Sequence, residues 1–160
     1  MYRPISEKEQ LWIDYLLNVD FPGRNILAKQ FLKAKVIYKQ EYSYISIKFK
    51  VEGEVEPYPF RVRVPIEMRA FQRTTSPIVF LLHVMDGIID ELEIYTADLT
   101  HIDANNIQLE NVEYVVNREE VRGDQSDVTW KKEPERIGEI KNFENRTNIW
   151  HNSGMMVLWL

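Results

Sequence analysis

The sequence predicts an α+β protein in which two N-terminal helices pack on one face of a mostly antiparallel, meander-like sheet of five or six strands. Three observations predict it. A helix-capping pattern lies near the N-terminus, apolar and polar residues alternate further along, and an Asp-Gly dipeptide joins two β-rich apolar runs. Helices that precede a succession of strands favour a fold in which the helices gather on one side of the sheet.

The first predicted helix spans about residues 7 to 18. Ser6 and Glu9 form a capping box at its start, since each side chain can bond the backbone N–H of the other. Phe21-Pro22-Gly23 ends this region, and a second helix is predicted over about residues 25 to 35. In both segments the large apolar residues recur at helical spacing, which indicates one buried face on each helix.

Strands are predicted from residue 36 onward because apolar and polar residues then alternate with period two. Between the third and fourth strands, residues 67–75 read as a polar helix or a loop. The six predicted strands are residues 36–41, 44–51, 60–64, 78–85, 88–95 and 112–116.

Asp86-Gly87 is a strong hairpin signal, because both residues tolerate the positive φ angles of a tight two-residue turn. A two-residue loop places His83 opposite Asp90 and Leu81 opposite Leu92. A three-residue loop with a bulge would instead place Leu82 opposite Asp90. In either register the first strand is apolar on both faces, so it is predicted to lie at the centre of the sheet.

The chain divides at about residue 117. Residues 1–117 are predicted to form the α+β domain, whereas residues 118–160 lose the regular pattern and are predicted to be an irregular extension. Three of the four tryptophans, Trp130, Trp150 and Trp159, lie in this extension. Because disordered segments are poor in aromatic residues, we expect it to dock on the same domain or on a partner subunit, in which case it would form a homodimer.

Composition restricts the location and the classes of partner. The chain contains no cysteine, which suits the reducing cytoplasm. Its first residues do not resemble a signal peptide, and no apolar run is long enough to span a bilayer. The prediction is therefore a cytoplasmic protein without a membrane partner, and the net charge of −5 argues against a nucleic-acid partner.

Acidic residues are concentrated in residues 74–117, a segment without lysine or arginine. This segment is either a solvated face that keeps the protein soluble or a surface for a cationic protein partner. As candidate partner-binding residues we take Glu91, Glu93, Asp98 and Asp103. Replacing Glu91 and Glu93 with lysine is expected to preserve the fold, because solvent-facing charges contribute little to stability. The acidic residues of the segment are Asp86, Asp90, Glu91, Glu93, Asp98, Asp103, Glu110 and Glu113.

The sequence predicts no catalytic, cofactor-binding or metal site. Its three histidines lack metal-ligand spacing, and neither a glycine-rich phosphate loop nor a GxSxG motif occurs. The simplest interpretation of His83 is a buried histidine bonded to a neighbour such as Asp90. The alternative is a small hydrolase-type enzyme that uses His83 with Asp90, or Glu91 with Glu93, in a cleft beside the hairpin.

Two motifs resemble a bacterial family of small domains of unknown function. They are Arg3-Pro4-Ile5-Ser6-x-x-Glu9 before a helix, and Asp86-Gly87 followed by Leu92-Glu93-Ile94-Tyr95-x-x-Asp98. The resemblance covers about residues 1–117, and proteins of this kind are similar to the immunity or accessory proteins of secreted toxin systems. It implies an immunity-like or accessory function. Together with the acidic segment and the absence of a catalytic signature, it favours a non-enzymatic inhibitor that docks an acidic surface on a cationic toxin domain and needs no cofactor.

Overall fold

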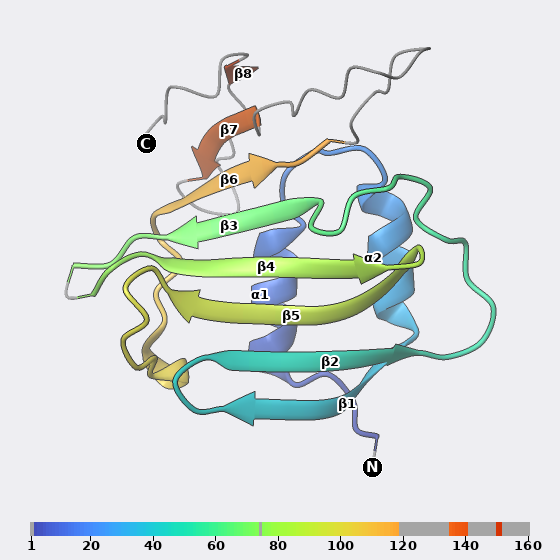
Figure 1. The fold of residues 1–160 in the computed structure, drawn as a ribbon, viewed down its shortest axis with the longest axis horizontal. Coiled ribbons are helices and arrows are strands. Elements are labelled where there is room, and N and C mark those ends of the chain that lie inside the picture. The colour runs from blue at the N-terminus through green and yellow to red at the C-terminus, as the bar shows by residue number, and fades with distance from the viewer. Residues whose placement is uncertain (1, 74, 119–134, 141–149, 152–160) are drawn as a thin grey trace, which may run out of the picture.

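The computed structural model describes residues 2–73, 75–118, 135–140 and 150–151, and it confirms the α+β prediction (Figure 1). Helices α1 (Glu7–Leu16) and α2 (Arg24–Leu32) both lie on one face of an antiparallel sheet. The strands of this sheet are β1 (Ala34–Glu41), β2 (Ile45–Val51), β3 (Ile66–Ala70), β4 (Ile78–Met85), β5 (Ile88–Thr96), β6 (Val112–Val116), β7 (Glu135–Ile140) and β8 (Trp150–His151).

The strand order across the sheet is β1-β2-β5-β4-β3-β6-β7-β8. Strands β3, β4 and β5 form a meander, and β1 and β2 form a hairpin that joins the sheet along β5. Residues 52–65 therefore pass the ends of β5 and β4 to connect β2 with β3, as Figure 1 shows to the right of the β4–β5 turn. This arrangement leaves β4 and β5 as neighbours near the middle of the sheet.

The capping box of α1 is confirmed. The Ser6 hydroxyl accepts a hydrogen bond from the Glu9 N–H at 3.2 Å, and the Ser6 N–H donates to Glu9 Oε1 at 2.9 Å. The Glu9 side chain is fully buried and also receives Arg3 Nη2 at 2.7 Å and Lys39 Nζ at 3.1 Å. One carboxylate thus ties the N-terminal segment, α1 and β1 together.

The face of the sheet beneath the helices is apolar. Trp12 of α1 meets Phe80 of β4 edge to face, with ring centroids 6.3 Å apart. Phe31 of α2 meets Phe49 of β2 in the same geometry at 5.3 Å. Such aromatic pairs, together with the burial of Leu82 and its neighbours, fix both helices on this side. We call this side of the sheet the inner face.

The hairpin turn is confirmed, but the predicted register beyond it is wrong in both of its forms. Asp86 and Gly87 have φ angles of 51° and 80°, and Met85 pairs with Ile88. A bulge in β5 then shifts the register, so that His83 pairs with Glu91. This one-residue shift keeps the apolar residues of β5 on the inner face, whereas the predicted register would have turned them outward.

The strand predicted at residues 60–64 is wrong, and the real strand β3 lies in the segment read as a polar helix or loop. Prolines at positions 57, 59 and 65 flank this segment and lack the N–H group that a strand ladder needs, so they restrict pairing at both of its ends. One backbone bond, from the Val84 N–H to the Arg63 carbonyl at 2.8 Å, holds this segment against β4.

Strands β7 and β8 come from the C-terminal extension. Strand β7 pairs with β6, and β8 pairs with β7, so these parts of the extension continue the same sheet. Trp150 lies in β8, whereas Trp130 and Trp159 lie outside the described residues. The prediction of a homodimer through the extension stays a prediction.

The buried Glu9 predicts how stability depends on pH. Burial by itself would raise the pKa of Glu9, but the bonds from Arg3, Ser6 and Lys39 outweigh it and lower the pKa from 4.5 to about 2. Because the pKa is lower in the folded state, this carboxylate stabilises the fold above about pH 4.5, and that contribution is lost as the pH falls toward 2.

Urea unfolding of wild type and Glu9→Gln, each measured across this pH range, tests the prediction. At neutral pH we expect the variant to have a lower free energy of unfolding by roughly 2–3 kcal/mol. The two proteins should converge as the pH falls toward 2. A difference that stays constant over the whole range would show that the ionised form of Glu9 is not what stabilises the fold.

Candidate functional site on the outer face of the sheet

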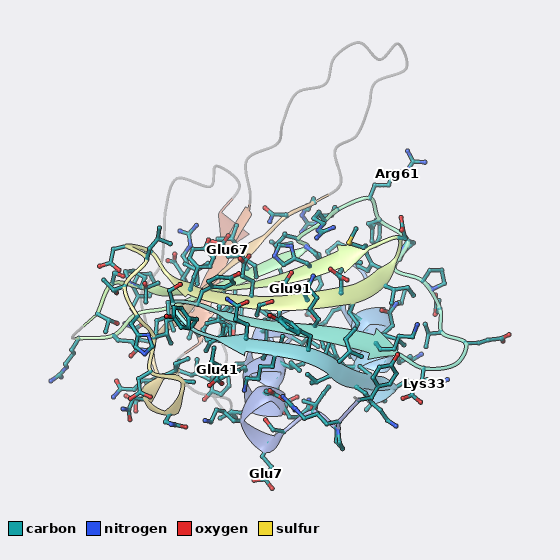
Figure 2. The ribbon with its side chains drawn as sticks, turned by 60° about the horizontal axis from the view of Figure 1, so that its bottom comes forward. Glu7, Lys33, Glu41, Arg61, Glu67 and Glu91 are labelled. Atoms are coloured by element: carbon teal, nitrogen blue, oxygen red, sulfur yellow. The ribbon has the colours of Figure 1, made fainter. Side chains whose placement is uncertain are left out.

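The face of the sheet opposite the helices, which we call the outer face, carries most of the charged side chains of the central strands. Figure 2 shows Glu67 and Glu91 on this side, away from helix α1 and its Glu7. Within the part of the chain that the structure describes, neither helix covers the outer face.

Strand register sorts the outer-face side chains into three rows that run across the strands. The first row is Ser46, Glu93, Leu81, Glu67 and Val115. The second is Lys48, Glu91 and His83. The third is Tyr95, Val79, Arg69 and Glu113. Residues in one row are cross-strand neighbours, and neighbouring rows are close enough for long side chains to meet diagonally.

In the second row, acidic residues of β5 are neutralised by cations from other parts of the chain. Glu91 contacts Ser46 Oγ, and one of its carboxylate oxygens lies 3.5 Å from Lys48 Nζ. Asp90 at the bulge lies 4.0 Å from Lys48 Nζ and 3.8 Å from Arg63 Nη2. Asp90 therefore shares Lys48 with Glu91, whereas plain alternation along the strand predicts that the two point to opposite faces.

His83 is bonded to a neighbour, as its simplest interpretation predicts, but it is half-buried, with 16% of its side chain exposed, and the partner is Glu93 and not Asp90. Its Nε2 lies 3.1 Å from Glu93 Oε1, and Arg63 Nε donates to its Nδ1 at 3.4 Å. A neutral ring satisfies both contacts, with Nε2–H as donor to Glu93 and Nδ1 as acceptor. Both ring nitrogens are thus engaged by the protein's own side chains.

A second cluster of charged side chains spans the first and third rows. Arg69 Nε contacts Glu67 Oε2, and Arg69 Nη1 lies 3.4 Å from Glu113 Oε1. Glu113 is nearly inaccessible, with 4% of its side chain exposed, whereas 17% of Glu67 and 33% of Arg69 are exposed. One guanidinium therefore lies between two carboxylates, one of them buried.

Two surface pockets of about 480 Å³ each lie on the outer face, and Tyr95 lines both of them. We name them the Val79 pocket and the Leu81 pocket. The Val79 pocket is lined by Glu67, Arg69, Phe71, Pro77, Val79, Tyr95, Ala97 and Glu113. The Leu81 pocket is lined by Ser43, Tyr44, Leu81, Glu93, Tyr95 and Leu99. Their volumes lie in the range of ligand-binding pockets.

Two carboxylates and one guanidinium act on the phenol of Tyr95. Burial is the main reason why its pKa is raised, and Glu67 and Glu93 raise it further, while Arg69 lowers it. Each of the two carboxylates affects the pKa more than the guanidinium does. A cation brought to Tyr95 would meet an attractive field.

The candidate residues Asp98 and Asp103 lie in the loop after β5, where each organises the backbone. Asp98 Oδ1 accepts from Ser76 Oγ at 2.7 Å and from Thr100 Oγ1 at 2.8 Å, and these bonds lower the pKa of Asp98 to about 2. Asp103 caps the short helix η1 (Ala104–Asn106) by accepting from the Asn105 N–H at 3.0 Å.

The loop that Asp98 organises presents an exposed apolar side chain beside the Leu81 pocket. Leu99 is 74% exposed and has a φ angle of 65°, a conformation that residues other than glycine rarely adopt. Its N–H donates to the Thr96 carbonyl at 2.9 Å. Strained residues concentrate at binding sites, so Leu99 belongs with the candidate site.

Sequence reasoning found Glu91 and Glu93 but missed Glu67, Arg69 and Glu113. The alternation of Ile66-Glu67-Met68-Arg69-Ala70 between apolar and charged residues was the available signal. That signal conflicts with composition, because glutamate, methionine, arginine and alanine all favour helices. Only the pairing of β3 with β4 and β6 brings these charges beside Tyr95.

Neither a metal-binding cluster nor a membrane-spanning helix is present in the described ranges. No three histidine, aspartate or glutamate side chains gather there in a way that could hold a metal ion. No helix of this part of the chain has the length and apolarity to span a bilayer.

Comparison with known proteins adds no relative. No family model, no curated protein and no solved structure matches this chain. The candidate function therefore rests on the geometry of the outer face.

The contacts of Glu91 revise the expectation for charge reversal. Only 16% of its side chain is exposed, and it binds Ser46 and Lys48. We therefore expect Glu91→Lys, which sets two ammonium groups side by side, to lower the free energy of unfolding by about 1–3 kcal/mol.

Chemical denaturation measures this loss, and Glu54→Lys provides a control with the same charge change at an exposed position in the 52–65 connection. The control should shift the free energy of unfolding by less than about 0.5 kcal/mol. Equal stability of the two variants would mean that Glu91 is a dispensable surface charge.

Proposed function

We propose that this protein is a non-enzymatic binding protein that docks its outer face on a basic protein partner, in the manner of an immunity-like inhibitor of a cationic toxin domain. The observation that supports this proposal most strongly is the charge of the side chains around Tyr95. Among the described residues that line the two pockets there, Glu67, Glu93 and Glu113 are acidic and Arg69 is basic. The excess of carboxylates favours a cationic surface as the occupant.

The apolar residues around the pockets support a protein as the partner. Leu99, which lines the Leu81 pocket, is 74% exposed. Tyr42 is 78% exposed and directly precedes Ser43, another residue that lines this pocket. Tyr95 lies between the pockets, with Val79 and Leu81 beside it. Aromatic and apolar groups enclosed by a charged rim are typical of protein interfaces, where a few such residues supply most of the affinity.

A hydrolase-type enzyme is the weaker proposal. It would need a free nitrogen on His83 to accept a proton from a water or a substrate. Glu93 and Arg63 engage both ring nitrogens, and Asp90 contacts Lys48 and Arg63 instead of His83. Glu91 and Glu93 share the outer face, but each of them is already bonded to a neighbouring side chain.

The proposed setting follows from the same arguments as the proposed activity. An inhibitor of a bacterial toxin would act in the cytoplasm of the cell that makes the toxin, and the absence of cysteine suits that compartment. An acidic docking face also argues against nucleic acid, whose phosphates it would repel.

A charge-neutral variant tests the proposal while preserving the hydrogen bonds of the sheet. Glu67→Gln/Glu93→Gln removes two carboxylates beside Tyr95, and glutamine can still accept from Arg69 and His83. Glu54→Gln/Glu56→Gln removes the same charge from exposed positions of the 52–65 connection. Proteins captured from the native cell by wild type and by the two variants are first compared by quantitative mass spectrometry.

The decisive measurement uses the purified candidate partner in a binding experiment at several ionic strengths. We expect a one-to-one complex, an association rate that falls as salt rises, and an affinity reduced about tenfold or more in Glu67→Gln/Glu93→Gln. The Glu54→Gln/Glu56→Gln control should bind like wild type. A partner that binds all three proteins alike, independently of salt, would contradict docking through the outer face.

A further inference from the structure

We propose that the Val79 pocket receives an arginine side chain of the partner, with the guanidinium stacked on Tyr95 and paired with Glu67. This inference rests on the proposed function and specifies which side chain of the partner enters the outer face.

The walls of the pocket suit a side chain with an apolar stem and a charged end. Val79, Pro77 and Ala97 supply apolar surface, and Tyr95 supplies an aromatic ring. The volume of about 480 Å³ exceeds what a single side chain needs, so the stem and some water can be accommodated together. The methylene groups of arginine pack well on such walls while the charged end reaches polar groups.

Among the described residues that line the pocket, two carry carboxylates, Glu67 and Glu113, and one carries a cation, Arg69. Arg69 contacts Glu67 and lies 3.4 Å from Glu113. Glu67 keeps 17% of its side chain exposed, so one carboxylate can accept from a second donor that enters from solvent. Glu93, 31% exposed, lies in the same row two strands away, about 10 Å from Glu67 at ordinary strand spacing.

Arginine fits this geometry better than lysine. Its planar guanidinium can lie flat on an aromatic ring and at the same time donate sideways to a carboxylate. An ammonium group is a compact, strongly hydrated charge that gains less from stacking. The carboxylates of Glu67 and Glu93 attract either cation, so the choice between them depends on shape.

Small amides test the pocket without knowledge of the partner. N-acetyl-arginine methylamide is titrated into the full chain and followed by two-dimensional NMR, together with the lysine and citrulline analogues. Citrulline has nearly the shape of arginine but carries no charge. We expect the arginine amide to bind in roughly the millimolar range, as suits one side chain. It should bind about tenfold more tightly than the citrulline amide, with the lysine amide between them.

Variants place the binding in the Val79 pocket. Tyr95→Leu and Glu67→Gln should each weaken the arginine amide several-fold, whereas Tyr95→Phe keeps the ring and should bind like wild type. Tyr38→Leu is a matched control, because Tyr38 is an exposed tyrosine of the edge strand β1. Wild-type-like NMR spectra of the free variants confirm that each one is folded.

The inference is overturned if the arginine and citrulline amides bind equally, or if Tyr95→Leu leaves arginine binding unchanged. That failure is distinguishable from failure of the proposed function. If the purified basic partner still depends on Glu67 and Glu93 but not on Tyr95, the outer face binds the partner without an arginine in this pocket. If the amide binds but no basic partner does, the pocket exists and the proposed function is wrong.

Discussion

The β-bulge at the start of β5 is the constraint on which the outer face depends. With the bulge, Leu92 and Ile94 lie on the inner face with the core, and Glu91, Glu93 and Tyr95 lie on the outer face. Without it, every side chain beyond the bulge would change faces, which would bury two carboxylates and expose two large apolar residues. Burying unpaired carboxylates costs several kcal/mol, so the core itself enforces the geometry of the site.

The hairpin that contains the bulge is held at its tip by a buried amide. Gln30 of α2 accepts from the Ile89 N–H at 2.9 Å and donates to the carbonyls of Gly87 and Glu56 at 2.9 and 3.0 Å. The Tyr58 N–H also donates to Gly87, at 2.8 Å. These bonds satisfy backbone groups at a point where the ladder is interrupted, and they connect the helix side of the molecule with the strands that carry the site. The inner layer thereby positions the outer face.

Local signals in the sequence predicted the parts of the fold that local physics decides. The capping box at Ser6 and the tight turn at Asp86-Gly87 depend on neighbouring residues alone, and both were predicted. The bulge depends on which residues of β5 the core buries. Strand β3 depends on its pairing with β4 and β6, which overrides the helix propensity of Glu67 and Arg69. Period-two alternation placed Glu91 and Glu93 on one face. The predicted partner of His83 was wrong, because it depends on the register between β4 and β5, which the bulge shifts. The pockets at Tyr95 needed the same long-range pairing.

The proposed docking surface is the outer face and not the helical side. Carboxyl footprinting tests it most directly, because carbodiimide-driven labelling reports the accessibility of individual glutamates by mass spectrometry. In the complex with the purified partner, Glu67 and Glu93 should lose most of their labelling relative to the free protein. Glu7, exposed on α1, and Glu54, in the 52–65 connection, should be labelled as before. Protection of Glu7 with undiminished labelling of Glu67 and Glu93 would contradict the account.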